Sequence, residues 1–224
     1  MCVKRFLFTS SVAAVGPTKK DEILDEGCIC KPVTAYGKSK LMAEELLPIV
    51  RDKIPYTILR LPLVYGPRSI GGLFTCFKLI NKGIELNIGK TESNVAFIKD
   101  VIEGMIMASE SPTTVNQTYC LGEDRIFNCM EIFKIVKHAL GRRTIRILFP
   151  YILLYSLAFF FELYAKITGT YPILRRRNVM SYIKCRYWRF TMRKAKIDFN
   201  FEAKVQLERG AKITADWYKH NQWI

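Results

Sequence analysis

The sequence predicts an α/β protein whose core is a parallel sheet. Short apolar runs rich in β-forming residues, such as 3–9 and 56–60, predict strands. Segments with apolar residues at helical spacing, such as 34–51 and 128–140, predict helices between and after them. A strand that is apolar along most of its length is typical of parallel sheets, which are covered on both faces. The 224 residues suffice for one full core with a smaller appendage.

The composition narrows the class of protein. Half of the residues are hydrophobic, with 3 Trp, 11 Tyr and 14 Phe, which excludes a disordered chain. The seven cysteines are an odd number and no secretory signal is recognised, so we expect free thiols and a cytoplasmic protein. Cys28 and Cys30 are too close for the usual zinc spacing and have no matching second pair, so no metal site is predicted.

The charge of the chain points to an anionic partner. The net charge is +15, which suits cofactor phosphates, acidic lipid or nucleic acid. Binding to nucleic acid would rest on charge alone, because no recognition module is found. We therefore do not expect a nucleic-acid partner.

The first elements are set by clear local signals. Strand 3–9 runs into the hydroxyls Thr9-Ser10-Ser11, and a loop-like stretch follows to residue 34. Helix 34–51 has a hydroxyl near its start and is ended by Ile54-Pro55. Strand 56–60 comes next and leads into the run from Leu61 to Arg68, whose Gly66-Pro67 pair predicts a sharp turn.

The rest of the chain continues to alternate between helices and strands. Asp100 is placed to cap the start of a helix that runs to about residue 109. The other predicted helices are 70–82 and 128–140, and the other predicted strands are 85–88, 118–121 and 144–148.

Two motifs carry chemistry. Tyr36 and Lys40 are four residues apart and so share one face of a helix. A protonated Lys40 beside the phenol would favour the phenolate, as an acid/base working near neutral pH needs. The second motif is the strand end with Ser11, 25 residues before Tyr36. Each residue alone has an ordinary structural explanation, and it is the combination that indicates a site.

These motifs together resemble the extended short-chain dehydrogenase/reductases, the NAD-dependent epimerase/dehydratase family. The resemblance implies the C-terminal part of a Rossmann-like, doubly wound parallel sheet with a small, mostly helical substrate lobe. Residues 1–145 would be a partial NAD(P)-binding domain with interleaved substrate-lobe segments, and 146–224 the helical lobe. No glycine-rich phosphate-binding turn is found in the sequence, so the resemblance is to the family without its N-terminal half.

The resemblance also implies roles for individual residues and a cofactor. Tyr36 would move the proton of the substrate hydroxyl, Lys40 would support it and hold the nicotinamide ribose, and Ser11 would bind the reacting oxygen. The cofactor would be NAD or NADP. Its predicted neighbours are Ser10, Tyr36, Lys40, Pro62, Leu63 and Val64.

Departures from the family pattern bear on the substrate. Val12 and Ala13 stand where 4,6-dehydratases carry an Asp-Glu pair, so that reaction is not expected. Leu63 stands where sugar-nucleotide epimerases usually carry Asn, and Ser93 where they carry a diphosphate-binding Arg. The resemblance thus favours a hydroxyl/ketone oxidoreductase of the 3-beta-hydroxysteroid dehydrogenase type with an apolar or small substrate. The alternatives are a nucleotide-sugar epimerase and an inactive fragment.

A long apolar segment and a basic segment bear on whether the protein contacts a membrane. Residues 147–161 are uncharged but fall short of the roughly 20 residues that span a bilayer, and we predict a buried helix of the substrate lobe there. The alternative is peripheral contact with the inner membrane face, through this segment and the basic segment 175–196.

The family resemblance also implies a homodimer through helix 34–51.

Overall fold

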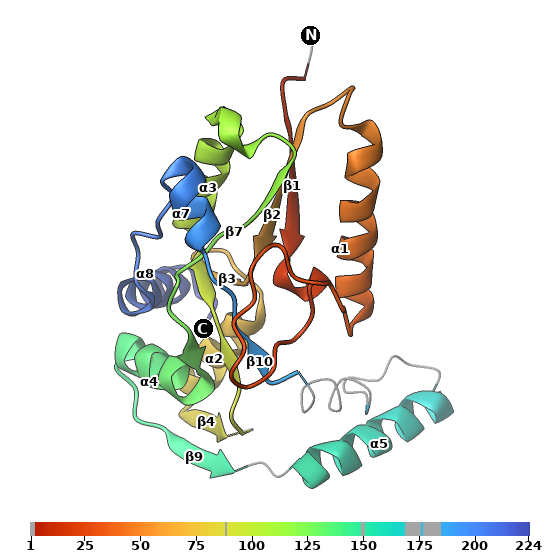
Figure 1. Cartoon of the computed structure of the whole chain (residues 1–224). Coiled ribbons are helices and arrows are strands. Elements are labelled where there is room, and N and C mark those ends of the chain that lie inside the picture. Colours follow the sequence, from red (N-terminus) through yellow and green to blue (C-terminus); the bar gives the residue numbers. More distant parts are fainter. Residues whose placement is uncertain (1–2, 88, 149–150, 169–175, 177–184) are drawn as a thin grey trace.

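A three-stranded parallel sheet lies at the centre of the molecule (Figure 1). The computed structural model describes residues 3–87, 89–148, 151–168, 176 and 185–224. Strands β1 (Phe6–Ser11), β2 (Tyr56–Leu61) and β7 (Gln117–Cys120) pair in that order. Helix α1 (Ala35–Leu46) lies on one side of the sheet, and α3 (Ile98–Glu110) and α7 (Arg193–Phe199) lie on the other (Figure 1). The predicted α/β fold with a parallel sheet is confirmed.

Strand β2 is the middle strand, and all six of its residues are buried. Leu59 and Leu61 pack with the side chains of α3, while Arg60, pointing to the opposite face, reaches α1. Strand β1 pairs with β2 on one edge, and no other strand of the described chain pairs with its second edge.

The predicted helix 34–51 is confirmed as α1 followed by a short 3₁₀ helix, η2 (Leu47–Val50). Thr34 is the N-cap of α1, and its hydroxyl accepts a hydrogen bond of 2.9 Å from the Gly37 amide. The 3₁₀ helix begins where Pro48 stands, because proline has no amide hydrogen to continue the α-helical ladder.

A second group of short strands lies beyond the carboxyl end of β2. Strand β3 (Leu63–Tyr65) pairs in parallel with β6 (Val95–Phe97), and β4 (Ile84–Asn87) pairs in parallel with β9 (Ile145–Leu148). Strand β5 (Glu92–Ser93) lies between β8 (Phe127–Asn128) and β10 (Tyr187–Trp188). The sequence does not predict β3, β5, β6, β8 or β10, because two or three residues show no periodicity.

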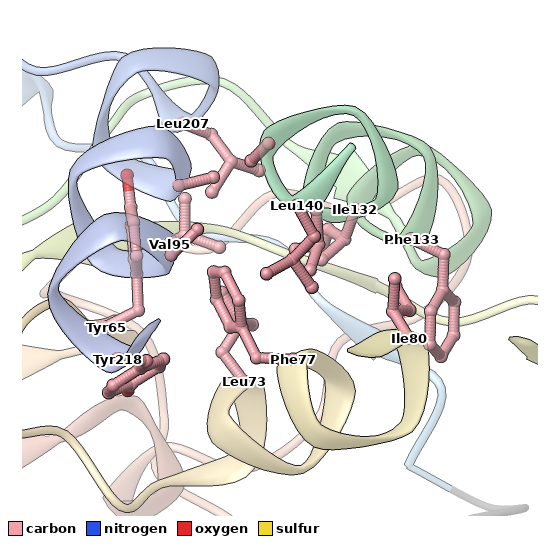
Figure 2. Close-up of a cluster of buried hydrophobic side chains, with 14 of the residues drawn as sticks. Tyr65, Leu73, Phe77, Ile80, Val95, Ile132, Phe133, Leu140, Leu207 and Tyr218 are labelled. Atoms are coloured by element: carbon pink, nitrogen blue, oxygen red, sulfur yellow. The ribbon is translucent and has the colours of Figure 1, made fainter. Parts of the chain in front are cut away.

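Three helices build the largest apolar cluster, and Figure 2 shows it. They are α2 (Gly72–Asn81), α4 (Cys129–Leu140) and α8 (Leu207–His220). Phe77 of α2 lies between α4 and α8, and Tyr218 of α8 packs edge-on against it with ring centroids 5.3 Å apart. The predicted helices 70–82 and 128–140 are confirmed.

Asp100 is not the cap that the sequence predicts. Helix α3 begins at Ile98, so Asp100 is inside its first turn, and the N-cap is Phe97. The buried Asp100 carboxylate accepts a 3.0 Å hydrogen bond from the amide of Val205, which ties α3 to the segment before α8. A long-range partner of this kind leaves no local signal in the sequence.

Helix α5 (Tyr151–Thr168) also differs from the prediction of a buried helix. Large apolar side chains along it, among them Leu157, Phe160 and Ile167, are exposed. An apolar segment of this length is normally buried in a core, so its exposure is a feature to be explained.

Gly210 in the first turn of α8 supports a testable prediction about packing. A Cβ atom there would lie 2.2 Å from the hydroxyl oxygen of Tyr65 and 2.9 Å from two of its ring carbons. Tyr65 is almost fully buried and cannot swing away. Gly210→Ala is therefore expected to lower the free energy of unfolding, measured in urea, by about 1–3 kcal/mol.

Two variants control for this result. Gly72→Ala, at the start of α2, brings its Cβ no closer than 3.5 Å to Leu63 and is expected to be neutral or slightly stabilising. Tyr65→Phe removes a hydroxyl that has no hydrogen-bond partner in the described chain, so it should recover part of the loss in the Gly210→Ala background. Equal stability of the two glycine variants would contradict the account of α8 packing.

Glu123 makes stability depend on pH. Its side chain accepts a 3.0 Å hydrogen bond from the amide of Leu207, the first residue of α8. Burial raises the pKa of Glu123 from the usual 4.5 to about 7. The folded protein therefore keeps a proton that the unfolded chain loses, so the free energy of unfolding falls as pH rises from 4.5 to about 7.

Glu123→Gln is expected to remove this part of the pH dependence. We expect it to flatten the curve by roughly 1–2 kcal/mol, a value reduced for solvent screening of a half-buried carboxyl. Chemical unfolding at a series of pH values measures the curve. Glu110→Gln changes an exposed glutamate on α3 and should leave the pH dependence of the free energy of unfolding unchanged. If the two variants showed the same pH dependence, the role of Glu123 would be refuted.

Candidate active site

The site begins where β1 ends. Ser11 is the last residue of β1, and its hydroxyl accepts a 3.2 Å hydrogen bond from the Ala13 amide, which caps the short 3₁₀ helix η1 (Val12–Ala14). Helix α1 packs directly on η1. A Cβ atom at Gly37 would lie 2.1 Å from the Ala13 carbonyl oxygen, so only glycine allows this approach. The close contact brings the first turn of α1, with Tyr36, beside the end of β1.

Tyr36 and Lys40 lie together, as their spacing predicts. The Lys40 ammonium is 5.9 Å from the centroid of the Tyr36 ring and 5.0 Å from that of Phe8. It also donates a 2.8 Å hydrogen bond to the carbonyl oxygen of Thr9, two residues before Ser11. The Tyr36 side chain is exposed, and its hydroxyl has no hydrogen-bond partner among the described residues. The arrangement is a cation and an accessible phenol at the carboxyl end of β1.

Ser11 opens into a cavity of about 640 Å³. Its wall at this end includes Thr34, the cap of α1, together with Pro62 and Leu63 after β2. The other predicted site residues do not line this cavity. Tyr36 and Lys40 lie on α1, outside the lining of the cavity. Val64 packs against the apolar cluster that contains Leu59 and Leu61 of β2. Ser10 is buried, with its hydroxyl bound to Glu44.

The cavity wall is largely apolar. Among the described residues that line it, only Glu92 is charged, and none is Lys or Arg. Ser93, the position predicted to lack a diphosphate-binding guanidinium, lines it too. Burial raises the pKa of the Cys76 thiol well above its usual range, so this lining thiol stays protonated and is a poor nucleophile. The apolar lining residues include Leu73, Leu79, Phe127, Ile132 and Phe133.

A buried ion pair that the sequence analysis misses holds this end of the sheet together. Arg60 on β2 donates 2.7 Å and 3.2 Å hydrogen bonds to the carboxylate of Glu44 on α1. Ser10, the register partner of Arg60 on β1, donates to the same carboxylate. Arg60 also donates to the Glu26 carbonyl oxygen at 3.3 Å. One charge pair thus fixes α1 relative to β1, β2 and the loop before Cys30.

Two signals in the sequence could have revealed this pair. Glu44 follows Tyr36 and Lys40 at the same four-residue interval, which places all three on one helix face. Arg60 is the one charged residue in the predicted strand 56–60, whose other residues are uncharged. A charge in a buried strand requires a partner, and a helix face directed at the sheet is where to look for it.

Residues 1–122, more than half of the chain, match the NAD dependent epimerase/dehydratase family. The chain is 28% identical over 173 residues to an N-acetyl-alpha-D-glucosaminyl-diphospho-ditrans,octacis-undecaprenol 4-epimerase of Escherichia coli O157:H7, covering 75% of this chain and 52% of the relative. It is 26% identical over 185 residues to a UDP-glucose 4-epimerase of Vibrio cholerae, covering 78% and 53%. The chain thus spans about half the length of both relatives. These relatives are epimerases, so they do not support the prediction of an oxidoreductase of the 3-beta-hydroxysteroid dehydrogenase type.

The fold has close counterparts among solved structures. One is a UDP-glucose 4-epimerase of Thermotoga maritima with UDP-glucose, with a TM-score of 0.75 at 22% identity, covering 98% of this chain and 65% of that one. Another is a UDP-glucuronic acid 4-epimerase of Bacillus cereus in complex with UDP-glucuronic acid and NAD, with a TM-score of 0.74 at 18% identity, covering 99% and 63%. At these identities the likeness supports the fold, and the sequence match supports the family. The chain belongs to the NAD dependent epimerase/dehydratase family.

Proposed function

We propose that this chain carries the catalytic part of an NAD-dependent epimerase that inverts a hydroxyl-bearing carbon of a sugar. The observation that supports it most is the pairing of Tyr36 with Lys40 at the end of β1, beside the cavity that Ser11 opens into. In open α/β sheets, ligands bind outside the carboxyl ends of the strands. The cation, the phenol and the serine hydroxyl all lie at that edge.

Each of the three side chains has a role in this proposal. Tyr36 as the phenolate accepts the proton of the sugar hydroxyl and later returns it. The Lys40 ammonium stabilises the phenolate, and its bond to Thr9 keeps it in place. The Ser11 hydroxyl donates a hydrogen bond to the reacting oxygen as charge develops there.

The residues at the strand ends suit a nicotinamide cofactor. Pro62 and Leu63 line the cavity beside Ser11 and would border the ring, with Val64 contributing through its backbone. NAD, when bound, supplies the chemistry of taking up a hydride and giving it back. Ser10 would meet the cofactor only through its backbone, because its side chain is bound to Glu44.

The cavity favours a substrate with an apolar carrier. The described lining offers neither Arg nor Lys for a diphosphate, which both kinds of substrate contain, so the choice between a lipid and a nucleotide as carrier rests on the largely apolar wall and on the relatives. The Escherichia coli relative acts, by its name, on a sugar carried by diphospho-undecaprenol, a long lipid. We therefore propose a lipid-linked sugar diphosphate as substrate, with a nucleotide sugar as the second candidate because the Vibrio cholerae relative is a UDP-glucose 4-epimerase.

A direct assay tests this function. The 224-residue protein is incubated with NAD and either undecaprenyl-diphospho-N-acetylglucosamine or UDP-N-acetylglucosamine, and the sugar is released and separated from its epimer by chromatography. We expect the epimer from the lipid-linked substrate. Formation of the epimer from the UDP-sugar alone would show that the substrate is a nucleotide sugar and not a lipid-linked sugar. If no epimer forms and NAD does not bind, the result would favour the alternative of a chain that is inactive by itself.

We also propose that the protein is a homodimer through α1. The outer face of this helix exposes Met42 and Leu46, and Ile49 is exposed in the 3₁₀ turn that follows. Three apolar side chains within two turns form a surface that a second copy could cover.

A further inference from the structure

Helix α5 carries an apolar stripe along its exposed side. Its residues Leu153, Leu157, Phe160, Tyr164 and Ile167 recur every three or four positions, so they lie on one face of the helix. All five side chains are exposed. The opposite face is marked by Ala158 and Ala165, seven residues apart and buried. The helix therefore turns its small residues inward and its large apolar residues to the surroundings.

The charged groups of α5 lie away from this stripe. Glu162 pairs with Arg176 at 2.7 Å, and the Arg176 guanidinium lies 5.1 Å from the centroid of the Phe159 ring. The single acid of the helix is thereby neutralised. Lys166, in the last turn, is exposed. What remains outside is an apolar surface, with the positive charge of Lys166 on another side of the same helix.

The sequence around the helix has an excess of positive charge. Residues 142–168 contain four Lys or Arg and one acid, and the whole chain has a net charge of +15. Arg143 on the approach to α5 is exposed. Figure 1 places α5 at the end of the molecule that also carries β9 and β10. A protein partner with an apolar groove would need no such charge, whereas anionic lipid headgroups are complementary to it.

We infer that α5 lies flat on an anionic membrane surface, with the stripe from Leu153 to Ile167 inserted among the headgroups and the adjacent basic side chains at the phosphates. An amphipathic helix that lies in the interface in this way combines apolar burial with electrostatic attraction. No helix in the described part of the chain is long and apolar enough to cross a membrane. The inference stands without the proposed function, although such a surface would present a lipid-linked sugar.

Binding to vesicles tests the inference without substrate or cofactor. The 224-residue protein is mixed with vesicles of phosphatidylcholine alone or of phosphatidylcholine with phosphatidylglycerol, and the bound fraction is measured by flotation. We expect binding to the anionic vesicles, weakened by added salt. Phe160→Glu/Tyr164→Glu is expected to weaken it by roughly tenfold or more, because two inserted rings become charged.

A matched pair on another helix provides the control. Ile102 and Ile106 of α3 are also four residues apart, with exposed fractions of 50% and 53% against 63% and 62% for Phe160 and Tyr164. Ile102→Glu/Ile106→Glu should leave vesicle binding unchanged. Circular dichroism checks that each variant keeps the fold.

Three outcomes would overturn the inference. The first is that the unaltered protein does not float with anionic vesicles at low salt. The second is that the α5 and α3 variants lose binding equally. The third is that the α5 variant changes the mass measured by light scattering while vesicle binding stays the same, which would make the stripe a contact between copies of this chain.

Discussion

Replacing Tyr36 with phenylalanine is expected to lower the turnover number by about 100- to 10,000-fold with little change in substrate binding. The phenol at the end of β1 is accessible and adjacent to a cation, with the Lys40 ammonium 5.9 Å from its ring centroid. Phenylalanine keeps the ring and its packing and removes only the oxygen that would exchange the proton. The epimer assay with the preferred substrate measures the effect.

Two lysines on the same helix sharpen this test. Lys40 reaches the Thr9 carbonyl oxygen, while Lys38, two residues earlier, is exposed on another side of α1. Lys40→Met should reduce turnover nearly as strongly as Tyr36→Phe, and Lys38→Met should leave it unchanged. Equal activity of the two lysine variants, or normal turnover in Tyr36→Phe, would exclude these groups from the chemistry.

Replacing Glu44 with alanine is expected to lower the free energy of unfolding by about 3–5 kcal/mol. Glu44 and Arg60 are both buried, and the loss of the carboxylate leaves the guanidinium buried without its counter-charge. The change also removes the acceptor of the Ser10 hydroxyl, so α1 loses one hydrogen-bonded contact to β1 and its ion pair with β2. Urea unfolding monitored by circular dichroism measures the loss.

The neighbouring glutamate serves as the control. Glu45 is exposed on the same helix, and Glu45→Ala is expected to change stability by no more than about 0.5 kcal/mol. Glu44→Leu combined with Arg60→Met should recover most of the stability, because two apolar side chains can replace a buried ion pair at small cost. If the alanine variants of Glu44 and Glu45 were equally stable, the pair would not hold α1 in place.

Much of the fold could be predicted because its signals are local. The apolar run at β1, the cap at Thr34 and the β-forming run at β2 each act within a few residues. These signals place the central strands and helix within two or three residues of where the structure has them. The short strands around β5 depend on pairing with distant segments, such as β10 at Tyr187–Trp188, and a two-residue strand has no pattern of its own.

The candidate site also combines features that local signals predict with features that depend on distant contacts. The four-residue spacing of Tyr36 and Lys40 was enough to predict their proximity, since helix geometry alone requires it. The sequence also predicts Ser10 as a neighbour of the cofactor, whereas its hydroxyl is bound to Glu44. That contact joins residues 34 positions apart on different elements, so it could be found only in three dimensions.

The outward stripe of α5 was hidden for another reason. Residues 147–161 are uncharged throughout, and an uninterrupted apolar segment gives no periodicity from which to tell the inner face from the outer one. The burial of Ala158 and Ala165 supplies that distinction.

Epimerisation in D₂O tests the central claim most directly. If the hydrogen leaves and returns as a hydride while Tyr36 moves only the hydroxyl proton, mass spectrometry of the epimer will find no deuterium on the inverted carbon. Deuterium at that carbon would mean that water exchanges with a carbon-bound proton, and it would contradict hydride transfer at this site.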